Sequence, residues 1–210
     1  MIGIFGGTFD PVHNGHLRSA IEVKEIFGLT EIRLIPSAQP PHRITPHSPA
    51  TMRAEMLRLA VRNHPGLIVD TRELDRQGAS FMVDTLLSLR HDFPQQPLLL
   101  IIGSDAFNQL TSWHQWQRLF DFAHIVVLTR PGFTVGQLED FLAERHTTHK
   151  QELSGQLVGK LFFQPITQLD ISATKIREMI ADKRNPAFLL PDTVLTYIKQ
   201  HQLYQVQTVT

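Results

Sequence analysis

The sequence of 210 residues contains no cysteine. Disulfide bonds, thiolate catalysis, zinc fingers with cysteine ligands and iron–sulfur clusters are therefore all excluded. Net charge is also missing, because 20 lysines and arginines balance 20 aspartates and glutamates. Such a chain has no overall attraction to nucleic acid or to an anionic membrane surface, and no local basic cluster replaces it. We expect neither kind of partner.

Long hydrophobic runs are absent as well, since no stretch approaches the ~20 apolar residues of a membrane-spanning helix. The first ten residues lack the basic region and apolar run of a secretion signal. We therefore expect a cytoplasmic protein. Apolar residues make up 42% and charged residues 19%, a balance typical of a globular protein rather than a disordered one. Because one domain spans about 100–200 residues, we expect a single domain over residues 1–210.

Short apolar runs alternate with longer segments of helical periodicity, a pattern typical of strands and helices around a parallel sheet. We predict strands over residues 2–5, 32–35, 67–69, 98–102, 125–128 and 160–163, and helices over 16–27, 49–64, 80–90, 135–145, 172–182 and 191–201. This order predicts an α/β fold: a doubly wound, Rossmann-like parallel sheet with helices on both faces. We expect the last two helices, about residues 172–201, to pack on the same core, and ligands to bind beyond the C-terminal ends of the strands.

Helix boundaries are indicated at four points of the sequence. Ser48, Ser80 and Ser172 each have the residue type of an N-cap, and Pro49 suits the first helical position. Gly28 follows the first predicted helix and suits its C-terminal end.

The first strand leads into Gly-Gly-Thr-Phe-Asp-Pro-Val-His-Asn-Gly-His over residues 6–16. Glycine lets a ligand approach the backbone, the Thr8 hydroxyl can donate, and a helix N-terminus favours anions. His13 and His16 are three residues apart, so both rings can face one side and donate to phosphate oxygens. A tight turn with two incidental histidines is the alternative, which this combination disfavours. The segment matches neither a P-loop nor the Gly-x-Gly-x-x-Gly fingerprint, yet it indicates a phosphate site.

A second motif, Ile-Ser-Ala-Thr-Lys-Ile-Arg, occupies residues 171–177. A helix start capped by Ser172 offers backbone N–H donors, and Arg177 adds a guanidinium suited to a polyphosphate. Taken alone, this motif favours an ordinary capped helix that carries a surface arginine; the first motif shifts the interpretation toward a polyphosphate site.

The first motif closely resembles the signature of the nucleotidyltransferase superfamily with the His-x-Gly-His motif, and the second resembles its Ile-Ser-x-Thr-x-Ile-Arg signature. Over essentially its whole length the chain is most similar to the bacterial nicotinate-nucleotide adenylyltransferase family. Phosphopantetheine adenylyltransferases usually have threonine where this chain has His13. Further motifs that carry the resemblance lie at residues 35–36, 40–43, 53–56, 72–74, 78–81, 101–105, 112–114 and 130–132.

The resemblance implies an enzyme of NAD biosynthesis that transfers the adenylyl group of ATP to nicotinate mononucleotide and releases pyrophosphate. It implies His13, His16 and Arg177 as catalytic residues. The implied ATP-binding residues are Gly6, Gly7, Thr8, Phe9, His13, His16, Gly103, Asp105, Ile171, Ser172, Thr174 and Arg177. The implied mononucleotide-binding residues are Thr8, His42, Arg43, Met82, Asp105, Trp113 and His114. Mg²⁺ is expected to accompany ATP, held by phosphates and water rather than by a protein cage.

Several of these positions have competing interpretations. The resemblance places Asp105 near a ribose and the Trp113 ring on the pyridine, although Trp113 also suits a half-buried core position; Trp116 suits the core better. His42 and Arg43 lie on a proline-rich loop, where phosphate binding and a solvated basic pair are equally compatible with the sequence.

Two departures from the family pattern concern the acceptor. The family commonly has Ser-Tyr-Thr where this chain has Ser80-Phe81-Met82, and tyrosine where it has His114. Two other functions therefore stay open: an adenylyltransferase acting on nicotinamide mononucleotide or another phosphate acceptor, and a non-catalytic nucleotide-sensing protein. The remaining histidine pair at positions 146 and 149 is expected on the surface without a metal.

Overall fold

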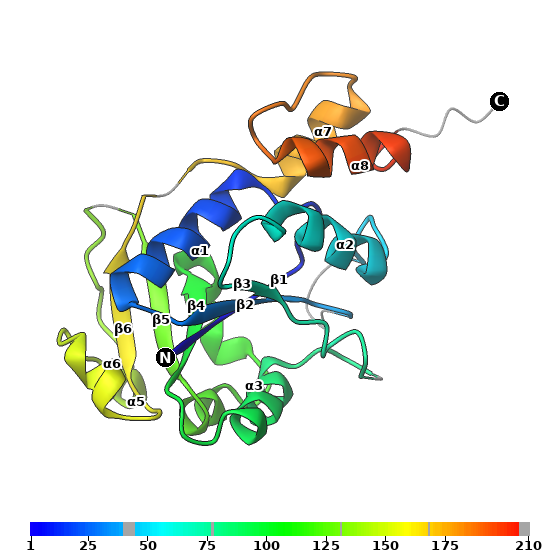
Figure 1. Cartoon of the computed structure of the whole chain (residues 1–210). Helices are drawn as coiled ribbons and strands as arrows, with labels where there is room; N and C mark the ends of the chain where they lie inside the picture. Colours follow the sequence, from blue (N-terminus) through cyan, green and yellow to red (C-terminus); the bar gives the residue numbers. More distant parts are fainter. Residues whose placement is uncertain (40–44, 77, 131, 168, 206–210) are drawn as a thin grey trace.

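The computed structural model describes residues 1–39, 45–76, 78–130, 132–167 and 169–205. Its centre is a parallel sheet of six strands in the order β3-β2-β1-β4-β5-β6 (Figure 1). The strands are β1 Ile2–Gly7, β2 Glu31–Pro36, β3 Leu67–Val69, β4 Leu98–Gly103, β5 His124–Thr129 and β6 Leu161–Pro165. Strand order reverses between β1 and β4, which is where doubly wound sheets bind ligands. The predicted fold class is thereby confirmed.

Ten helical segments connect and flank the strands in the described parts of the chain. They are α1 Asn14–Phe27, α2 Ala50–Val61, α3 Met82–Asp92, α4 Ser104–Phe107, η1 Leu110–Ser112, η2 Trp116–Asp121, α5 Asp140–Ala143, α6 Gln151–Gly155, α7 Ala173–Ala181 and α8 Asp192–Gln200. The four helices α1, α2, α7 and α8 lie on one side of the sheet, and α3 lies on the other (Figure 1). None of these described helices is long and apolar enough to cross a membrane.

The central strand β4 shows why the sheet is covered on both faces. Leu99 and Ile101 pack into the apolar cluster beneath α1 and α2, whereas Leu98 and Leu100 pack into the cluster beneath α3. Successive strand residues point to opposite faces, so an uninterrupted apolar run buries both. Val194 of α8 belongs to the first cluster.

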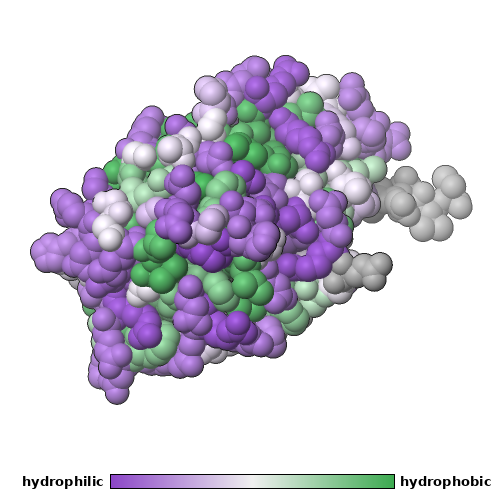
Figure 2. Space-filling view, turned by 60° about the horizontal axis from the view of Figure 1, so that its bottom comes forward, coloured by the Kyte–Doolittle hydropathy of each residue, from purple (hydrophilic) through white to green (hydrophobic). Residues whose placement is uncertain are grey.

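The surface on the α3 side is mostly polar. Figure 2 shows purple polar side chains over most of this face, with green apolar side chains in small patches between them. Leu87 of α3 is among the apolar side chains that remain exposed, with 50% of its surface accessible.

Three predicted helix features are wrong. The helix expected over residues 135–145 is confined to Asp140–Ala143, because the segment before it exposes Val135 and contains Gly136, so no buried face offsets the cost of helix formation. Pro49, not Ser48, is the N-cap of α2. The Ser80 hydroxyl accepts the backbone N–H groups of Ala38 and Gln39 instead of capping α3.

Two predicted helix ends are confirmed. Ser172 caps α7, since its hydroxyl oxygen accepts the Lys175 N–H over 3.4 Å. Gly28 ends α1 with a φ of 58°, the left-handed conformation that glycine adopts without strain.

Candidate active site

A cleft at the C-terminal ends of β1 and β4 brings the two sequence motifs together, and we call it the motif cleft. The motif cleft is lined by Gly6, Gly7, Thr8, Phe9, His13, His16, Gly103, Asp105, Ile171, Thr174 and Arg177, together with residues that the sequence did not single out. Ser172 does not line the cleft, because its hydroxyl caps α7. Residues about 155 positions apart in the sequence thus share one cleft.

The turn after β1 is built around the buried ring of Phe9. Phe9 is only 2% exposed and has a φ of 49°, which is uncommon for a residue with a side chain. A Cβ atom at position 7 would lie 3.0 Å from the Phe9 Cζ atom, so the second glycine makes room for this ring. The ring also meets that of His16 edge-on, with centroids 5.0 Å apart. Gly7 and Phe9 therefore fix the place of His16.

His13 and His16 face the same side, as their spacing predicts. Their rings are stacked, with centroids 3.7 Å apart. The backbone N–H of His13 donates to the Nδ1 atom of His16 over 3.3 Å. A neutral His16 ring must then carry its proton on Nε2. A Cβ atom at Gly15 would lie 3.0 Å from the His13 Nδ1 atom, so the glycine lets the two rings stack.

Both imidazoles are held neutral at pH 7. Burial lowers the pKa of His13 to about 4. Burial, and then the neighbouring His13, lower the pKa of His16 well below its ordinary value. Neutral rings each keep one N–H donor and do not repel each other. An anion that enters the cleft stabilises the protonated forms, so it raises both pKa values.

Arg177 of α7 connects the second motif to the first. Its Nη1 atom donates to the backbone oxygen of Asp10 over 2.7 Å, and its Nη2 atom donates to the Thr174 hydroxyl over 3.2 Å. The guanidinium is thereby oriented at the edge of the motif cleft, next to the N-terminus of α7. A planar cation and a helix N-terminus together form a site for an anion with several negative oxygens.

A second, smaller hollow adjoins the motif cleft. Aromatic side chains line it, so we call it the ring cavity. Phe81, Trp113 and His114 line it, and the rings of Phe81 and His114 pack with centroids 4.3 Å apart. Met82 at the start of α3 also lines it. The two positions that depart from the family pattern, 80–82 and 114, are thus neighbours in one wall.

The motif cleft and the ring cavity share part of their walls. The residues that line both are Gly6, Gly7, Thr8, Ala106 and Gln109. A group lying over the end of β1 is therefore within reach of both hollows. This is the geometry that a two-substrate transfer requires.

The family model described as cytidylyltransferase-like matches residues 4–179. A "Probable nicotinate-nucleotide adenylyltransferase" from Methylococcus capsulatus is 49% identical over 208 residues, which cover 97% of this chain and 99% of that protein. The chain belongs to the nicotinate-nucleotide adenylyltransferases of the cytidylyltransferase-like family. A relative of the same description from Pseudomonas putida (strain GB-1) is 47% identical, with 97% and 94% of the two chains covered. The resemblance stated from the two motifs is thereby confirmed.

Solved structures show the same fold. The nicotinic acid mononucleotide adenylyltransferase of Plasmodium falciparum complexed with NaAD has a TM-score of 0.72 at 17% identity, covering 97% of this chain and 96% of that chain. The same protein complexed with APC has a TM-score of 0.70 at 16% identity, with the same coverage.

Within this adenylyltransferase fold, the motif turn is held from behind by a buried arginine whose contacts the sequence did not reveal. Arg53 of α2 is 1% exposed and donates to the backbone oxygens of Thr8 (2.6 Å), Ser37 (2.6 Å) and Ser48 (3.1 Å). These carbonyls come from the β1–α1 turn, the loop after β2 and the approach to α2. A lone arginine between apolar helix residues was the signal that could have revealed it, because such a group must find acceptors when buried.

The ring cavity has its own support in an acidic residue of the 72–74 motif, whose contacts the sequence did not reveal. Glu73 lines the cavity at 4% exposure, and its carboxylate accepts the Thr85 hydroxyl over 2.7 Å. Burial raises the pKa of this carboxyl group. The contact ties the turn before α3 to the second turn of the helix.

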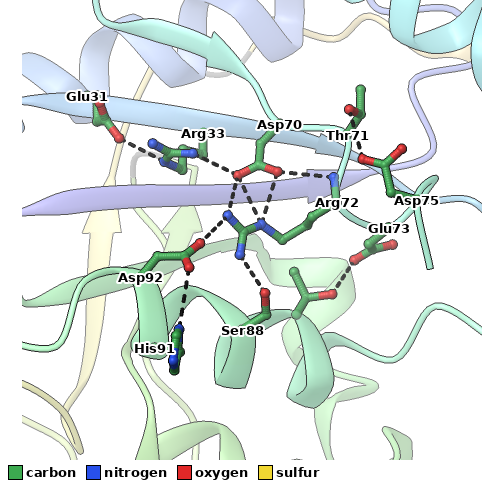
Figure 3. A network of polar contacts seen from close by, with 11 residues as sticks. Glu31, Arg33, Asp70, Thr71, Arg72, Glu73, Asp75, Ser88, His91 and Asp92 are labelled. Atoms are coloured by element: carbon green, nitrogen blue, oxygen red, sulfur yellow. Dashed lines mark hydrogen bonds and ion pairs between the residues drawn. The ribbon is translucent and has the colours of Figure 1, made fainter.

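An ion-pair network lies behind Glu73 (Figure 3). Asp70 accepts from Arg33 of β2 over 2.9 Å and from Arg72, which also bonds to the Ser88 hydroxyl and to Asp92 of α3. Burial would raise the pKa of Asp70, but hydrogen bonds from Arg72 and then Arg33 outweigh it and lower the pKa below its ordinary value. The network anchors α3, and with it one wall of the ring cavity, to the sheet.

The remaining site predictions have mixed outcomes. His42 and Arg43 lie outside the described residues. Trp113 and Trp116 are both half-buried, so the core role expected for Trp116 alone does not separate them. What separates them is the cavity, because Trp113 lines it while Trp116 packs edge-on against Phe141 at 5.1 Å.

Proposed function

We propose that the protein transfers the adenylyl group of ATP to the 5′-phosphate of nicotinate mononucleotide, forming deamido-NAD and pyrophosphate. One observation carries this proposal: the motif cleft, lined by both phosphate-type motifs, shares the wall Gly6-Gly7-Thr8 with the ring cavity. ATP in the motif cleft and a pyridine nucleotide in the ring cavity would meet over this wall. The close relatives named above are described as enzymes of this reaction.

The motif cleft supplies donors for the polyphosphate. The His16 Nε2–H, directed by the backbone contact at Nδ1, would donate to the α-phosphate with His13 beside it. Arg177 and Thr174, at the start of α7, would hold the β- and γ-phosphates. We assign Ser172 to the same end through the helix that it caps rather than through its hydroxyl.

Bond making in this proposal needs no nucleophilic side chain. An oxygen of the acceptor phosphate forms a bond to the α-phosphorus of ATP, and the bond from this phosphorus to the bridging oxygen breaks. Pyrophosphate leaves with that oxygen and its electron pair. His13 and His16 would stabilise the negative charge that grows on the α-phosphate, because preorganised donors act most strongly where charge develops.

The nucleoside parts of ATP are assigned to the other walls of the motif cleft. Asp105 would accept from ribose hydroxyls, and Gly103 lies in open space, where a ligand can approach the backbone. Ile171 would contribute an apolar surface. Gly6, Gly7, Thr8 and Phe9 complete the ATP-binding residues that we propose.

For the acceptor, we propose stacking of the pyridine on Trp113 between Met82 and His114. Helix α3 begins at Met82 without a capping side chain, so the first N–H groups of the helix are available for a carboxylate. This arrangement favours the acid over the amide mononucleotide. His42 and Arg43 are assigned to the acceptor phosphate from the sequence alone.

Mg²⁺ is proposed to enter with ATP. The two carboxylates among the described lining residues of the motif cleft are Asp10 and Asp105. The Asp10 oxygens already accept the Tyr204 hydroxyl and the His47 N–H. Mg²⁺ prefers six oxygen ligands, so this donor set suits an ion held by phosphates and water. The ion supplies charge neutralisation on the polyphosphate.

The test is an acceptor screen with purified protein, ATP and Mg²⁺. We expect pyrophosphate release with nicotinate mononucleotide, and much slower release with nicotinamide mononucleotide. Faster turnover of the amide would assign the other acceptor. ATP binding by calorimetry without pyrophosphate release from any acceptor would instead support a nucleotide-sensing protein.

A further inference from the structure

Tyr204, close to the C-terminus, reaches the first motif across 194 positions of sequence. Its hydroxyl donates to the Asp10 Oδ1 atom over 2.7 Å. Its backbone has a φ of 63°, a left-handed conformation that is rare for aromatic residues and persists where contacts hold it. Its ring packs against the apolar cluster beneath α1 and α2. Tyr204 is thus fixed to the motif turn by a specific contact.

Asp10 accepts hydrogen bonds from three partners through three different atoms. Its carboxylate, on a residue 4% exposed, accepts the Tyr204 hydroxyl at Oδ1 and the His47 backbone N–H at Oδ2, both over 2.7 Å. Its backbone oxygen accepts the Nη1 atom of Arg177 over 2.7 Å. The guanidinium therefore contacts the carbonyl of Asp10 while the negative charge of the same residue is held by neutral donors.

This arrangement matters because a hydrogen bond from a guanidinium to a carboxylate is stronger than one from a guanidinium to a neutral carbonyl. Two guanidinium groups lie near this carboxylate. The charge of Asp10 acts on Arg53, but Arg53 already donates to three backbone carbonyls. Arg177 contacts the Asp10 backbone oxygen, so a carboxylate released from Tyr204 would pair with Arg177. The resulting ion pair would neutralise the cation and turn its N–H groups away from the motif cleft. Burial, and then the charge of Asp10, raise the pKa of Tyr204, so the hydroxyl keeps its proton and remains a donor.

We propose that Tyr204 is a positioning residue for nucleotide binding, which restrains the Asp10 carboxylate and so keeps Arg177 available to the polyphosphate of ATP. The inference rests on the proposed function only in taking ATP as the ligand of the motif cleft. Tyr204 lines neither the motif cleft nor the ring cavity, so its effect passes through Asp10 and Arg177.

The test compares two single-atom deletions, Tyr204→Phe and Tyr197→Phe. Tyr197 is the other tyrosine of the chain and lies in α8. Its ring packs at a tilt against His201, with centroids 4.2 Å apart, and its hydroxyl makes no hydrogen bond to the described residues. For Tyr204→Phe we expect the Kd and KM for ATP to rise roughly 10- to 150-fold, the range for loss of a hydrogen bond to a charged group, with KM for nicotinate mononucleotide within about twofold. Tyr197→Phe is expected to match the wild type for both substrates.

A double variant tests the charge directly. Asn at position 10 cannot form an ion pair with Arg177, so Tyr204→Phe combined with Asp10→Asn is expected to bind ATP more tightly than Tyr204→Phe alone. Equal or weaker binding by the double variant overturns the inference, as does unchanged ATP affinity in Tyr204→Phe. Equal losses for both substrates in Tyr204→Phe would indicate a structural role and overturn it too.

The readouts separate this inference from the proposed reaction. Calorimetry with ATP alone requires no acceptor and no turnover, whereas the acceptor screen measures the reaction. Wild-type protein that binds ATP but releases no pyrophosphate would refute the proposed function and leave the Tyr204 comparison fully measurable. Normal wild-type turnover with an unaltered Tyr204→Phe variant would refute only the role of Tyr204.

Discussion

The motif cleft and the ring cavity adjoin each other but are built from different chemistry. The groups of the motif cleft that can bind an anion are N–H donors, which come from two imidazoles, one guanidinium and a helix N-terminus. The ring cavity depends on three aromatic side chains and on α3, which an ion-pair network fixes from behind. Because the two hollows share only a short wall, we infer that affinity for each substrate can be altered separately.

Among the variants, the largest difference between the two hollows is expected from His16→Ala, which should lower turnover without altering acceptor affinity. Loss of one preorganised donor to a developing negative charge lowers turnover by about 10²–10³-fold. Affinity for nicotinate mononucleotide should change little, because His16 does not line the ring cavity. Steady-state kinetics and acceptor calorimetry measure both effects. The control is His91→Ala, whose side chain is 92% exposed on α3; near wild-type turnover of His16→Ala would refute the phosphate site.

The next largest effect is expected from low pH, which should lower the free energy of unfolding through His13 in the motif cleft. The pKa of His13 is 6.5 in the unfolded chain and about 4 in the fold. As the pH falls below 6.5, the unfolded chain takes up the proton first, so the stability that neutral His13 contributes is complete above 6.5 and is lost toward pH 4. The separation of about 2.5 pKa units corresponds to at most about 3–4 kcal/mol of unfolding free energy.

Urea unfolding across this pH range measures the effect. His13→Asn should show a shallower dependence of the unfolding free energy on pH than the wild type, whereas Trp113→Phe in the ring cavity should keep the wild-type slope. Parallel curves for His13→Asn and the wild type would contradict the neutral, buried state of this ring.

Trp113→Ala should have the opposite effect to His16→Ala, because it alters the ring cavity and leaves the motif cleft intact. Loss of a stacking surface lowers mononucleotide affinity by roughly 1–3 kcal/mol, by analogy with base–aromatic stacking, while ATP affinity stays near the wild-type value. Trp113→Phe should recover part of the loss without altering the preference for acid over amide. Trp116→Ala is the control, since Trp116 packs on Phe141 instead. Equal loss of both ligands in Trp113→Ala would make it a core residue.

The smallest effect is expected from Arg177→Lys. A single ammonium replaces a planar fork but keeps the positive charge, so a loss equivalent to one ordinary hydrogen bond raises the KM for ATP by about tenfold or less. KM for the mononucleotide should remain unchanged, because Arg177 lines only the motif cleft. Equal changes in both KM values would move Arg177 away from the polyphosphate.

Local patterns predicted the fold well and the support of the site poorly. Each strand is signalled by a short apolar run, and the stacking of His13 and His16 follows from their spacing on a helix start. Arg53 could not be placed in this way, because its three carbonyl partners come together only after β1, β2 and α2 have packed. The contact between Asp10 and Tyr204 likewise depends on the path of the whole chain. The substrate contacts of the site residues stay predictions.

The short wall formed by Gly6, Gly7 and Thr8 has a kinetic consequence for the proposed reaction. In that reaction, two separate ligands would occupy the two hollows before transfer, and one dinucleotide would span both afterwards. Linking two ligands covalently makes the second contact intramolecular, so the product is held with the avidity of a bivalent ligand. Of the contacts made before transfer, only those to the departing pyrophosphate would be lost. We therefore expect release of the dinucleotide, rather than bond formation, to limit turnover.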